Sequence, residues 1–280
     1  MIVDLANAEP QSHAQFGEDL ILAEIFGERS DGYCVEVGAN DGRTGSASYL
    51  FEKRGWRCLL IEPIPALVEE IREHRACMVV NCAVSNKEGV ATLFVAENVE
   101  AMSTLDLTSD RLKWIEQVGG AIKEITVRTA TLDSLLAEAA FPEIQFITID
   151  VEGHEMAVLE GLTLEAHRPR IVIIENNSGS DDPRASSSDP RVGRHMSEHG
   201  YVHFRRTGVN EWYAHQSDVE LVRPDEIRRF QRAKVRRRWK RGGKLLSNRM
   251  ATRVGAYLPT PVKRRLREPF DYLRSKGSRR

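Results

Sequence analysis

Short apolar runs alternate with amphipathic stretches along most of the 280-residue chain. Apolar runs bounded by glycine, proline and small polar residues are typical of strands, whereas apolar residues every three or four positions indicate helices. Helices are expected over residues 20–26, 47–54, 66–75 and 192–199, from residue 131 onward, and up to residue 161. Strands are expected over residues 33–37, 57–61, 77–82, 90–96, 125–129, 144–149, 170–174, 202–205 and 211–215.

This order of elements predicts an α/β protein. Strands that alternate with helices form a parallel sheet with helices on both faces, and the nearly all-apolar run 144–149 suits the buried middle of such a sheet. Ligands of these sheets bind beyond the carboxyl ends of the strands. Polar clusters follow the expected strands at residues 38–42, 62, 81–85, 150–155 and 175–176.

The loop after the first strand carries Gly38, Gly42 and Gly45 and leads into a helix. A strand, a glycine-rich turn and a helix in succession bring backbone N–H groups close to a ligand, and glycine permits turns that a side chain forbids. The spacing Glu-x-Gly-x-x-x-Gly is neither the dinucleotide fingerprint nor the phosphate-binding loop of the NTPases.

Glu62 stands at the tip of the second strand, where an acidic residue can accept hydrogen bonds from ribose hydroxyls. A ribose ligand without a pyrophosphate is what S-adenosylmethionine offers. An ordinary α/β crossover with a solvated carboxylate is the alternative, and the position of Glu62 favours the cofactor.

Asp150 ends one expected strand, and Glu175 and Asn176 end the next. If these strands are neighbours, two carboxylates and an amide oxygen converge, which suits Mg²⁺. Such an ion would lower the pKa of a substrate hydroxyl. In the alternative without a metal, Asp150 orients the cofactor or caps a helix, and Glu175 and Asn176 only make hydrogen bonds.

Glu152 and His154 follow at the mouth of the same edge. An alkyl hydroxyl is a poor nucleophile, and a group that titrates near neutrality, about pH 6.5 for histidine, can act as its general base. We therefore take Asp150, Glu152 and His154 as candidate catalytic residues. A plain surface histidine at a helix start is the alternative.

The polar stretch 97–120 separates two expected strands and is too long for a plain connection. We interpret it as a flap that shapes the substrate site. A loosely packed surface excursion is the alternative.

The charge of the chain is divided unevenly. Residues 223–280 carry 21 Lys+Arg and 4 Asp+Glu, whereas residues 1–222 carry 19 and 37. A basic amphipathic tail with Trp239 and Phe230 is typical of a helix that lies on an anionic membrane. An acidic partner would suit it equally, and disorder and nucleic-acid binding are the further alternatives, in that order.

Taken together, the motifs resemble the FkbM family of S-adenosylmethionine-dependent methyltransferases over residues 12–215. Gln15-Phe16-Gly17-Glu18-Asp19 also resembles the opening motif of that family, with Ala14 where serine is usual. The other residues that carry the resemblance are Glu-Val-Gly-Ala-Asn-Asp-Gly at 36–42, Gly55-Trp56, Ile61-Glu62-Pro63, Ile-Asp-Val-Glu-Gly-His-Glu at 149–155, Val158-Leu159, Arg168-Pro169-Arg170 and Glu175.

The resemblance implies a class I methyltransferase fold, which is Rossmann-like and doubly wound, with a mostly parallel seven-stranded sheet whose last strand is antiparallel. It implies O-methylation, commonly of a sugar hydroxyl in a glycan, glycolipid or secondary metabolite. The set Asp150, Glu175 and Asn176 also resembles the metal triad of catechol-type O-methyltransferases. By similarity, Gly38, Ala39, Asn40 and Asp41 would line the methionine and ribose, Glu62 the ribose, Ala83 and Val84 the adenine, and Asp150 the junction of cofactor and substrate; Glu36 and Gly42 complete the expected cofactor set.

Two other functions stay open: an RNA or protein methyltransferase guided by the basic tail, and a non-catalytic cofactor-binding scaffold. The chain lacks the Asn/Asp-Pro-Pro-aromatic motif of many nucleobase N-methyltransferases, and its acidic strand ends argue against a scaffold. We divide the chain into an N-terminal helical lid (1–30), a methyltransferase domain (31–218) and a basic, partly helical or disordered extension (219–280).

The expected partners are a sugar-containing small molecule or glycan, an anionic membrane and, in a homo-oligomer, a second copy of the chain; nucleic acid is not favoured. No apolar run approaches the ~20 residues of a membrane-spanning helix, and the N-terminus has no basic region followed by an apolar core. We therefore expect a cytoplasmic protein with peripheral contact to the inner face of the membrane.

Overall fold

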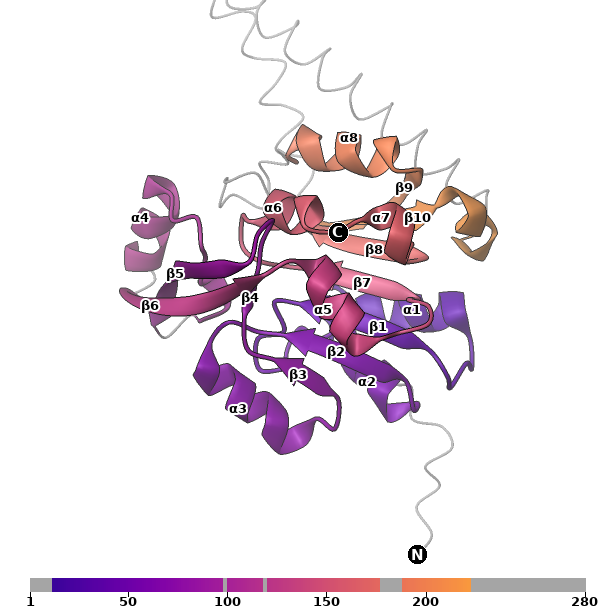
Figure 1. Ribbon diagram of the computed structural model, residues 1–280, viewed down its shortest axis with the longest axis horizontal. Helices are drawn as coiled ribbons and strands as arrows, with labels where there is room; N and C mark the ends of the chain where they lie inside the picture. The colour runs from indigo at the N-terminus through magenta and orange to yellow at the C-terminus, as the bar shows by residue number, and fades with distance from the viewer. Residues whose placement is uncertain (1–11, 98–99, 118–119, 177–187, 223–280) are drawn as a thin grey trace, which may run out of the picture. The chain divides into compact units, whose positions relative to one another are not determined.

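A computed structural model of the chain describes residues 12–97, 100–117, 120–176 and 188–222. Its centre is a seven-stranded sheet in the order β3-β2-β1-β7-β8-β10-β9 (Figure 1). Strands β1, β2, β3, β7 and β8 run parallel, and β10 runs antiparallel to its neighbours β8 and β9. The expected sheet with an antiparallel last strand is thus confirmed. The strands are β1 (Tyr33–Val37), β2 (Arg57–Ile61), β3 (Met78–Val80), β7 (Phe146–Ile149), β8 (Ile171–Glu175), β9 (Tyr201–Thr207) and β10 (Asn210–His215).

The central strands are apolar at almost every position because the sheet has a core on each face. In β1, Val35 and Val37 belong to one core and Cys34 to the other. In β2, Leu59 belongs to the first core and Leu60 to the second. Successive side chains of a strand point to opposite faces, so a strand covered on both sides is a continuous apolar run.

Helices cover both faces of this sheet. Four of them contribute to the core of Val35: α5 (Leu132–Ala139), α6 (Glu155–Glu160), α7 (Leu164–His167) and α8 (Pro190–Glu198). The core of Cys34 receives residues from α1 (Glu18–Phe26), α2 (Tyr49–Lys53) and α3 (Pro65–His74). Val222, which ends the 3-10 helix Gln216–Val222, is buried in this second core. The packed body therefore extends past the boundary expected at residue 218.

The segment between β3 and α5 differs from the expectation. The third strand is shorter than 77–82, and β4 (Ala83–Val84), β6 (Ala121–Ala130) and β5 (Gly89–Glu97) form a second sheet in that order. The alternating patterns predicted β5 and β6 as strands, but periodicity does not reveal which sheet a strand joins. Between them lie a 3-10 helix (Glu100–Met102) and α4 (Ser109–Gln117), so this stretch is more than a plain loop.

Among the residues described, no helix combines the length and the apolarity needed to cross a bilayer. The basic tail, residues 223–280, lies outside the described residues, and its contact with a membrane stays a prediction.

Candidate active site

A cavity of about 470 Å³ lies where β1, β2 and β7 end. Parallel strands end at the same edge of a sheet, which brings segments far apart in sequence to one place. The cavity is lined by residues 13–15 of an N-terminal strap (residues 12–17), by the glycine loop (residues 38–46), by Glu62 and its neighbours, by residues 100–103 of the flap (residues 100–117), and by residues 150–152.

The glycine loop depends on glycine most strongly at Gly38. Its φ is 80°, and a Cβ there would lie 1.8 Å from the carbonyl oxygen of Asp150. Gly42 has φ 71°, and its Cβ would lie 2.9 Å from the side chain of Ile71. Only glycine satisfies both requirements, a left-handed backbone and the space taken by a neighbour. The backbone therefore approaches the strand end of β7 directly.

Glu62 connects the two sides of the cavity. Its carboxylate accepts the backbone N–H of Asn40 at 2.9 Å and that of Ile64 at 3.0 Å. The side chain is buried, and burial raises the pKa of Glu62 to about 7 despite these two hydrogen bonds. The carboxylate thus holds the glycine loop in place and also lines the cavity.

Most of the residues expected to bind the cofactor face this region. Ala83 and Val84 line a smaller recess next to the cavity, together with Leu93 and Leu105. Asp41 accepts the N–H groups of Arg43 and Thr44 and so shapes the outer turn of the loop. Of the others, Glu36, Gly38, Ala39, Asn40, Glu62 and Asp150 line the cavity, whereas Asp41 and Gly42 are not among its lining residues.

Three carboxylates form an acidic cluster at the ends of β7 and β8. One oxygen from each of Asp150, Glu152 and Glu175 can be chosen so that all lie within 4.8 Å of one another. Burial and the neighbouring charge of Asp150 raise the pKa of Glu175 to about 11 and that of Glu152 to about 8. Burial also raises the pKa of Asp150, although that residue is open to the cavity. At neutral pH these shifts favour the protonated forms of Glu152 and Glu175.

The structure does not bring Asn176 into this cluster. Its side-chain oxygen accepts the N–H of Asp189 at 2.6 Å, and its amide nitrogen donates to Glu211 at 3.1 Å. Both ends of the Asn176 amide are therefore occupied by protein partners. The expected set of Asp150, Glu175 and Asn176 was wrong in one member, because Glu152 and not Asn176 lies with the other two. The place of Asn176 at the end of a strand did not reveal these contacts, because successive side chains point in different directions.

The two other catalytic candidates are placed differently. Glu152 lines the cavity and forms an ion pair with Arg111 at 2.9 Å. His154 lines the smaller recess, with its ring nitrogens 2.5 Å from a carboxylate oxygen of Asp106 and 3.0 Å from the hydroxyl of Ser85. Asp150 and Glu152 are thus closer to the main cavity than His154 is.

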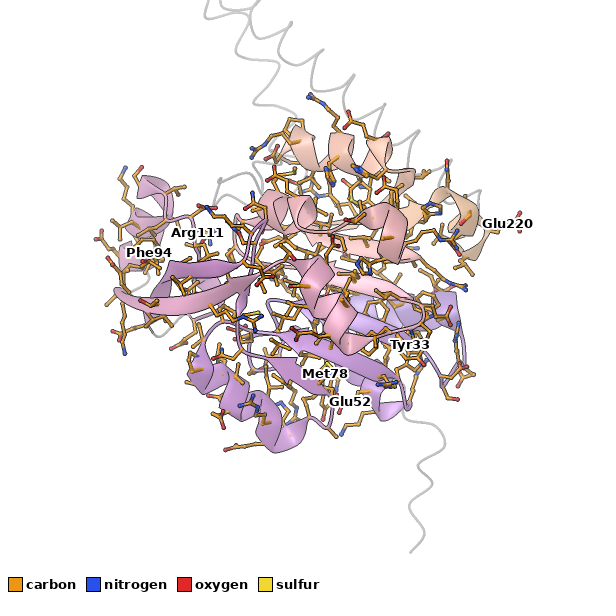
Figure 2. The ribbon with its side chains drawn as sticks, viewed as in Figure 1. Tyr33, Glu52, Met78, Phe94, Arg111 and Glu220 are labelled. Carbon is orange, nitrogen blue, oxygen red and sulfur yellow. The ribbon has the colours of Figure 1, made fainter. Side chains whose placement is uncertain are left out.

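Sequence reasoning missed Arg111, which projects from α4 in the flap (Figure 2). It ties the flap to the acidic cluster through Glu152. Thr104 adds a second tie, because its hydroxyl donates to the Glu152 carbonyl at 2.9 Å. Arg111 is one of many charged residues in a polar stretch, so the sequence gives no signal for this role.

The strap also closes on the glycine loop. The N–H of Gly45 donates to the carbonyl of His13 at 2.8 Å. The buried carboxylate of Asp19 holds the strap by accepting the N–H of His13 at 2.8 Å and the hydroxyl of Ser12 at 2.6 Å. The opening motif of the chain therefore contributes a wall of the cavity.

The order of the sheet, its reversed β10 and a cavity beyond β1, β2 and β7 define a class I methyltransferase fold. Residues 36–202 match the family model described as the Methyltransferase FkbM domain. This match covers more than half of the chain, so the protein belongs to the FkbM methyltransferase family and is a methyltransferase.

Among curated proteins, the hexuronic acid methyltransferase AglP of Haloferax volcanii is 35% identical over 57 residues, which are 20% of this chain and 24% of that protein. The chain thus matches about a quarter of the length of this relative.

Solved structures give weaker likenesses. Methyltransferase FkbM from Methylobacillus flagellatus has a TM-score of 0.39 and 14% identity over 66% of this chain and 44% of its own. The O-methyltransferase from Bacillus cereus in complex with SAH has a TM-score of 0.34 and 16% identity over 74% and 84%.

Proposed function

We propose that this protein transfers a methyl group from S-adenosylmethionine to a hydroxyl of a sugar. The observation that carries the proposal is Glu62, a buried carboxylate at the end of β2 that lines the cavity beside the glycine loop. A carboxylate in that position suits the two hydroxyls of a ribose.

The residues around the cavity fit this donor. Each oxygen of Glu62 accepts one backbone N–H, and each keeps lone pairs for a further hydrogen bond. Gly38 has no Cβ, so the glycine loop can lie directly against the Asp150 carbonyl at the edge of the cavity. Ala83 and Val84 offer apolar contacts in the smaller recess, which suit a flat adenine. The carboxylates of Glu36 and Asp150 line the main cavity and would offset the positive charge of the donor.

S-adenosylmethionine would supply the methyl group from its sulfonium. The protein then has to align an acceptor oxygen and take up its proton. Asp150 and Glu152 line the cavity, and both belong to the acidic cluster. An ionised member of this cluster can accept the proton of the acceptor hydroxyl. His154 is less suited, because both its ring nitrogens already face protein partners.

Two observations support a sugar as the acceptor. The short match to a hexuronic acid methyltransferase is one. The other is the cavity, whose volume lies in the range of small-molecule sites. Its carboxylates can accept hydrogen bonds from a polyhydroxyl ligand.

The acidic cluster also fits a divalent cation, which would bind Asp150, Glu152 and Glu175 and lower the pKa of a bound hydroxyl. Dialysis against EDTA separates the two modes of action. Methyl transfer that is lost and then restored by Mg²⁺ supports the ion, and unchanged transfer supports the carboxylates alone.

Titration calorimetry tests the donor site. The unaltered protein is expected to bind S-adenosylmethionine, and Glu62→Ala to bind it at least about tenfold more weakly, because charged hydrogen bonds to the ribose are lost. Glu69→Gln, which changes an exposed glutamate on α3, is the matched control. Equal binding by Glu62→Ala, or none by the unaltered protein, contradicts the assignment.

Labelled methyl transfer tests the acceptor. The full chain is incubated with labelled donor and with separate pools of neutral sugars, uronic acids, glycolipids, RNA and protein. Label in a carbohydrate pool supports the proposal, and label only in RNA or protein supports the rival enzyme. Donor binding without any transfer supports the scaffold.

A further inference from the structure

The glycine loop is held in an unusual backbone conformation. Gly38, Asn40, Gly42 and Gly45 all have positive φ, at 80°, 50°, 71° and 79°. Asn40 carries a side chain, and its conformation is one that most residues avoid. A loop of this kind keeps its shape only when surrounding contacts determine it.

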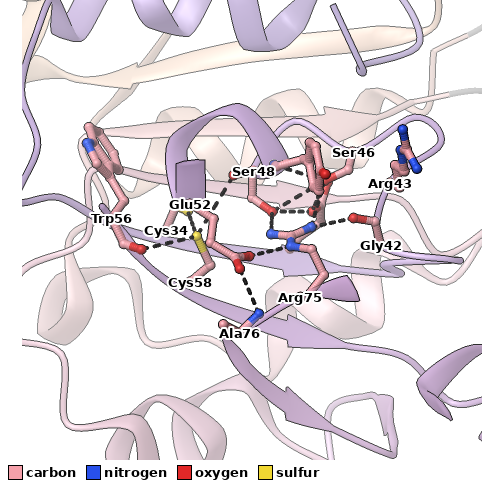
Figure 3. A network of polar contacts seen from close by, with 12 residues as sticks. Cys34, Gly42, Arg43, Ser46, Ser48, Glu52, Trp56, Cys58, Arg75 and Ala76 are labelled. Atoms are coloured by element: carbon pink, nitrogen blue, oxygen red, sulfur yellow. Dashed lines mark hydrogen bonds and ion pairs between the residues drawn. The ribbon is translucent and has the colours of Figure 1, made fainter. Parts of the chain in front are cut away.

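A buried arginine makes several of those contacts (Figure 3). The side chain of Arg75, just after α3, has no exposed surface. One guanidinium nitrogen donates to the carbonyl oxygen of Gly42 and, at 3.3 Å, to the hydroxyl of Ser46. The other terminal nitrogen donates to the hydroxyl of Ser48 at 2.9 Å, and Nε donates to the carboxylate of Glu52.

The two serines pass this contact on to the cavity. Each hydroxyl accepts from Arg75 and can therefore donate its own proton elsewhere. Ser46 donates to Glu36 at 2.8 Å, and Ser48 donates to the same carboxylate oxygen at 2.6 Å. The second oxygen of Glu36 accepts the N–H of Ala47 at 2.8 Å. Glu36 lines the cavity, so the network extends from α3 to the cavity wall.

A second connection runs through the backbone. The N–H of Gly42, whose carbonyl is bound by Arg75, donates to the carbonyl of Ala39 at 2.8 Å. Ala39 lines the cavity next to Gly38. A shift of Arg75 would therefore move the part of the loop that faces a ligand.

We propose that Arg75 is a positioning residue for donor binding, which holds the glycine loop in its binding shape through Gly42, Ser46 and Ser48. The inference rests on the proposed function, because the loop is taken to bind the donor. A planar guanidinium serves several acceptors at fixed angles, whereas a lysine ammonium does not. Charge alone is therefore not enough at this position.

The test measures the binding of S-adenosylmethionine to the full chain by titration calorimetry. Arg75→Lys keeps the positive charge but loses the planar guanidinium that donates to several acceptors at once. The double variant Ser46→Ala/Ser48→Ala removes both hydroxyl bridges and keeps every charge, so it remains informative if Arg75→Lys does not fold. Tyr201→Phe is the control, because it removes a buried hydrogen bond, to the carbonyl of Pro169, on edge strand β9.

Arg75→Lys and Ser46→Ala/Ser48→Ala are each expected to bind the donor about tenfold more weakly than Tyr201→Phe at a matched loss of thermal stability. Hydrogen exchange should become faster in a peptide that covers residues 38–46 and stay unchanged in one that covers β7. Donor binding equal to that of the unaltered protein, or reduced no more than in Tyr201→Phe, overturns the role of Arg75. Absence of binding by the unaltered protein overturns the proposed function itself.

Discussion

At the scale of the residue, the Glu62 carboxylate holds the glycine loop and, in the proposed function, also binds the ribose of the donor. Both contacts depend on whether the carboxylate is protonated. The ionised carboxylate can accept hydrogen bonds from both the backbone and a ribose, whereas the protonated form has lost part of this capacity. Burial favours the protonated form and raises the pKa of Glu62 to about 7. Its charge state therefore changes near physiological pH.

Donor affinity is expected to rise with pH between about pH 6 and about pH 8, as Glu62 ionises. Calorimetry across this range checks the slope, and Glu62→Gln is expected to remove it. The unliganded fold behaves in the opposite way. Because the folded-state pKa of Glu62 lies above the ordinary value of 4.5, Glu62 contributes stability that is fully present below pH 4.5. This contribution is lost as the pH rises through about 7. The same slope of affinity in Glu62→Gln would show that another group titrates.

Gly38→Ala tests the close approach of the loop to β7. The new methyl group would collide with the Asp150 carbonyl, and the left-handed backbone would be strained as well. We expect a loss of about 2–4 kcal/mol in the free energy of unfolding, measured with urea. Gly45→Ala is the control, because its φ of 79° is nearly that of Gly38, at 80°, but nothing lies within 4 Å of the added Cβ. It should lose only about 1 kcal/mol; equal losses would count against the collision.

At the scale of the element, the flap and the strap each contribute a wall of the cavity. Each is attached through polar contacts: Arg111 and Thr104 reach Glu152, and Asp19 holds residues 12–13. The flap contact is also electrostatic, because the charge of Arg111 opposes the effects of burial and of Asp150 on Glu152.

Arg111→Met is expected to raise the pKa of Glu152 further above its value of about 8, since burial and Asp150 then act without a nearby cation. Carboxyl NMR of labelled glutamate measures the titration midpoint. Arg72→Met, which removes an exposed cation on α3, should leave it unchanged. An unchanged midpoint in Arg111→Met would mean that the flap does not control this carboxylate.

At the scale of the whole molecule, the packed body includes the segment after β10. Val222 is 2% exposed and belongs to the core beneath the sheet. A chain shortened after residue 222 keeps this contact, and a chain shortened after residue 218 loses it.

We expect the chain that ends at residue 222 to unfold at the same urea concentration as the full chain. The chain that ends at residue 218 should lose at least about 1.5–3 kcal/mol in the free energy of unfolding, the contribution of one buried valine.

With anionic vesicles, the full chain should sediment and the chain that ends at residue 222 should not, because the latter lacks the basic tail. Equal sedimentation of these two chains would exclude the tail as the membrane contact.

The sequence by itself determined the alternation of strands and helices, the glycine loop and the place of Glu62. These follow from local rules: buried strands are apolar throughout, left-handed turns need glycine, and ligands bind where parallel strands end. The resemblance carried by the motifs then indicated the family that the match over residues 36–202 shows.

Only the tertiary structure decided which side chains meet. It placed Glu152 rather than Asn176 with Asp150 and Glu175, turned His154 toward Asp106 and Ser85, and moved β5 and β6 into a separate sheet. It also brought the guanidinium of Arg75 into contact with Gly42 and Ser46 of the glycine loop. The physical reason is the same in each case: local pattern fixes the burial of a face, whereas a contact between distant residues depends on pairing and direction that no short stretch encodes.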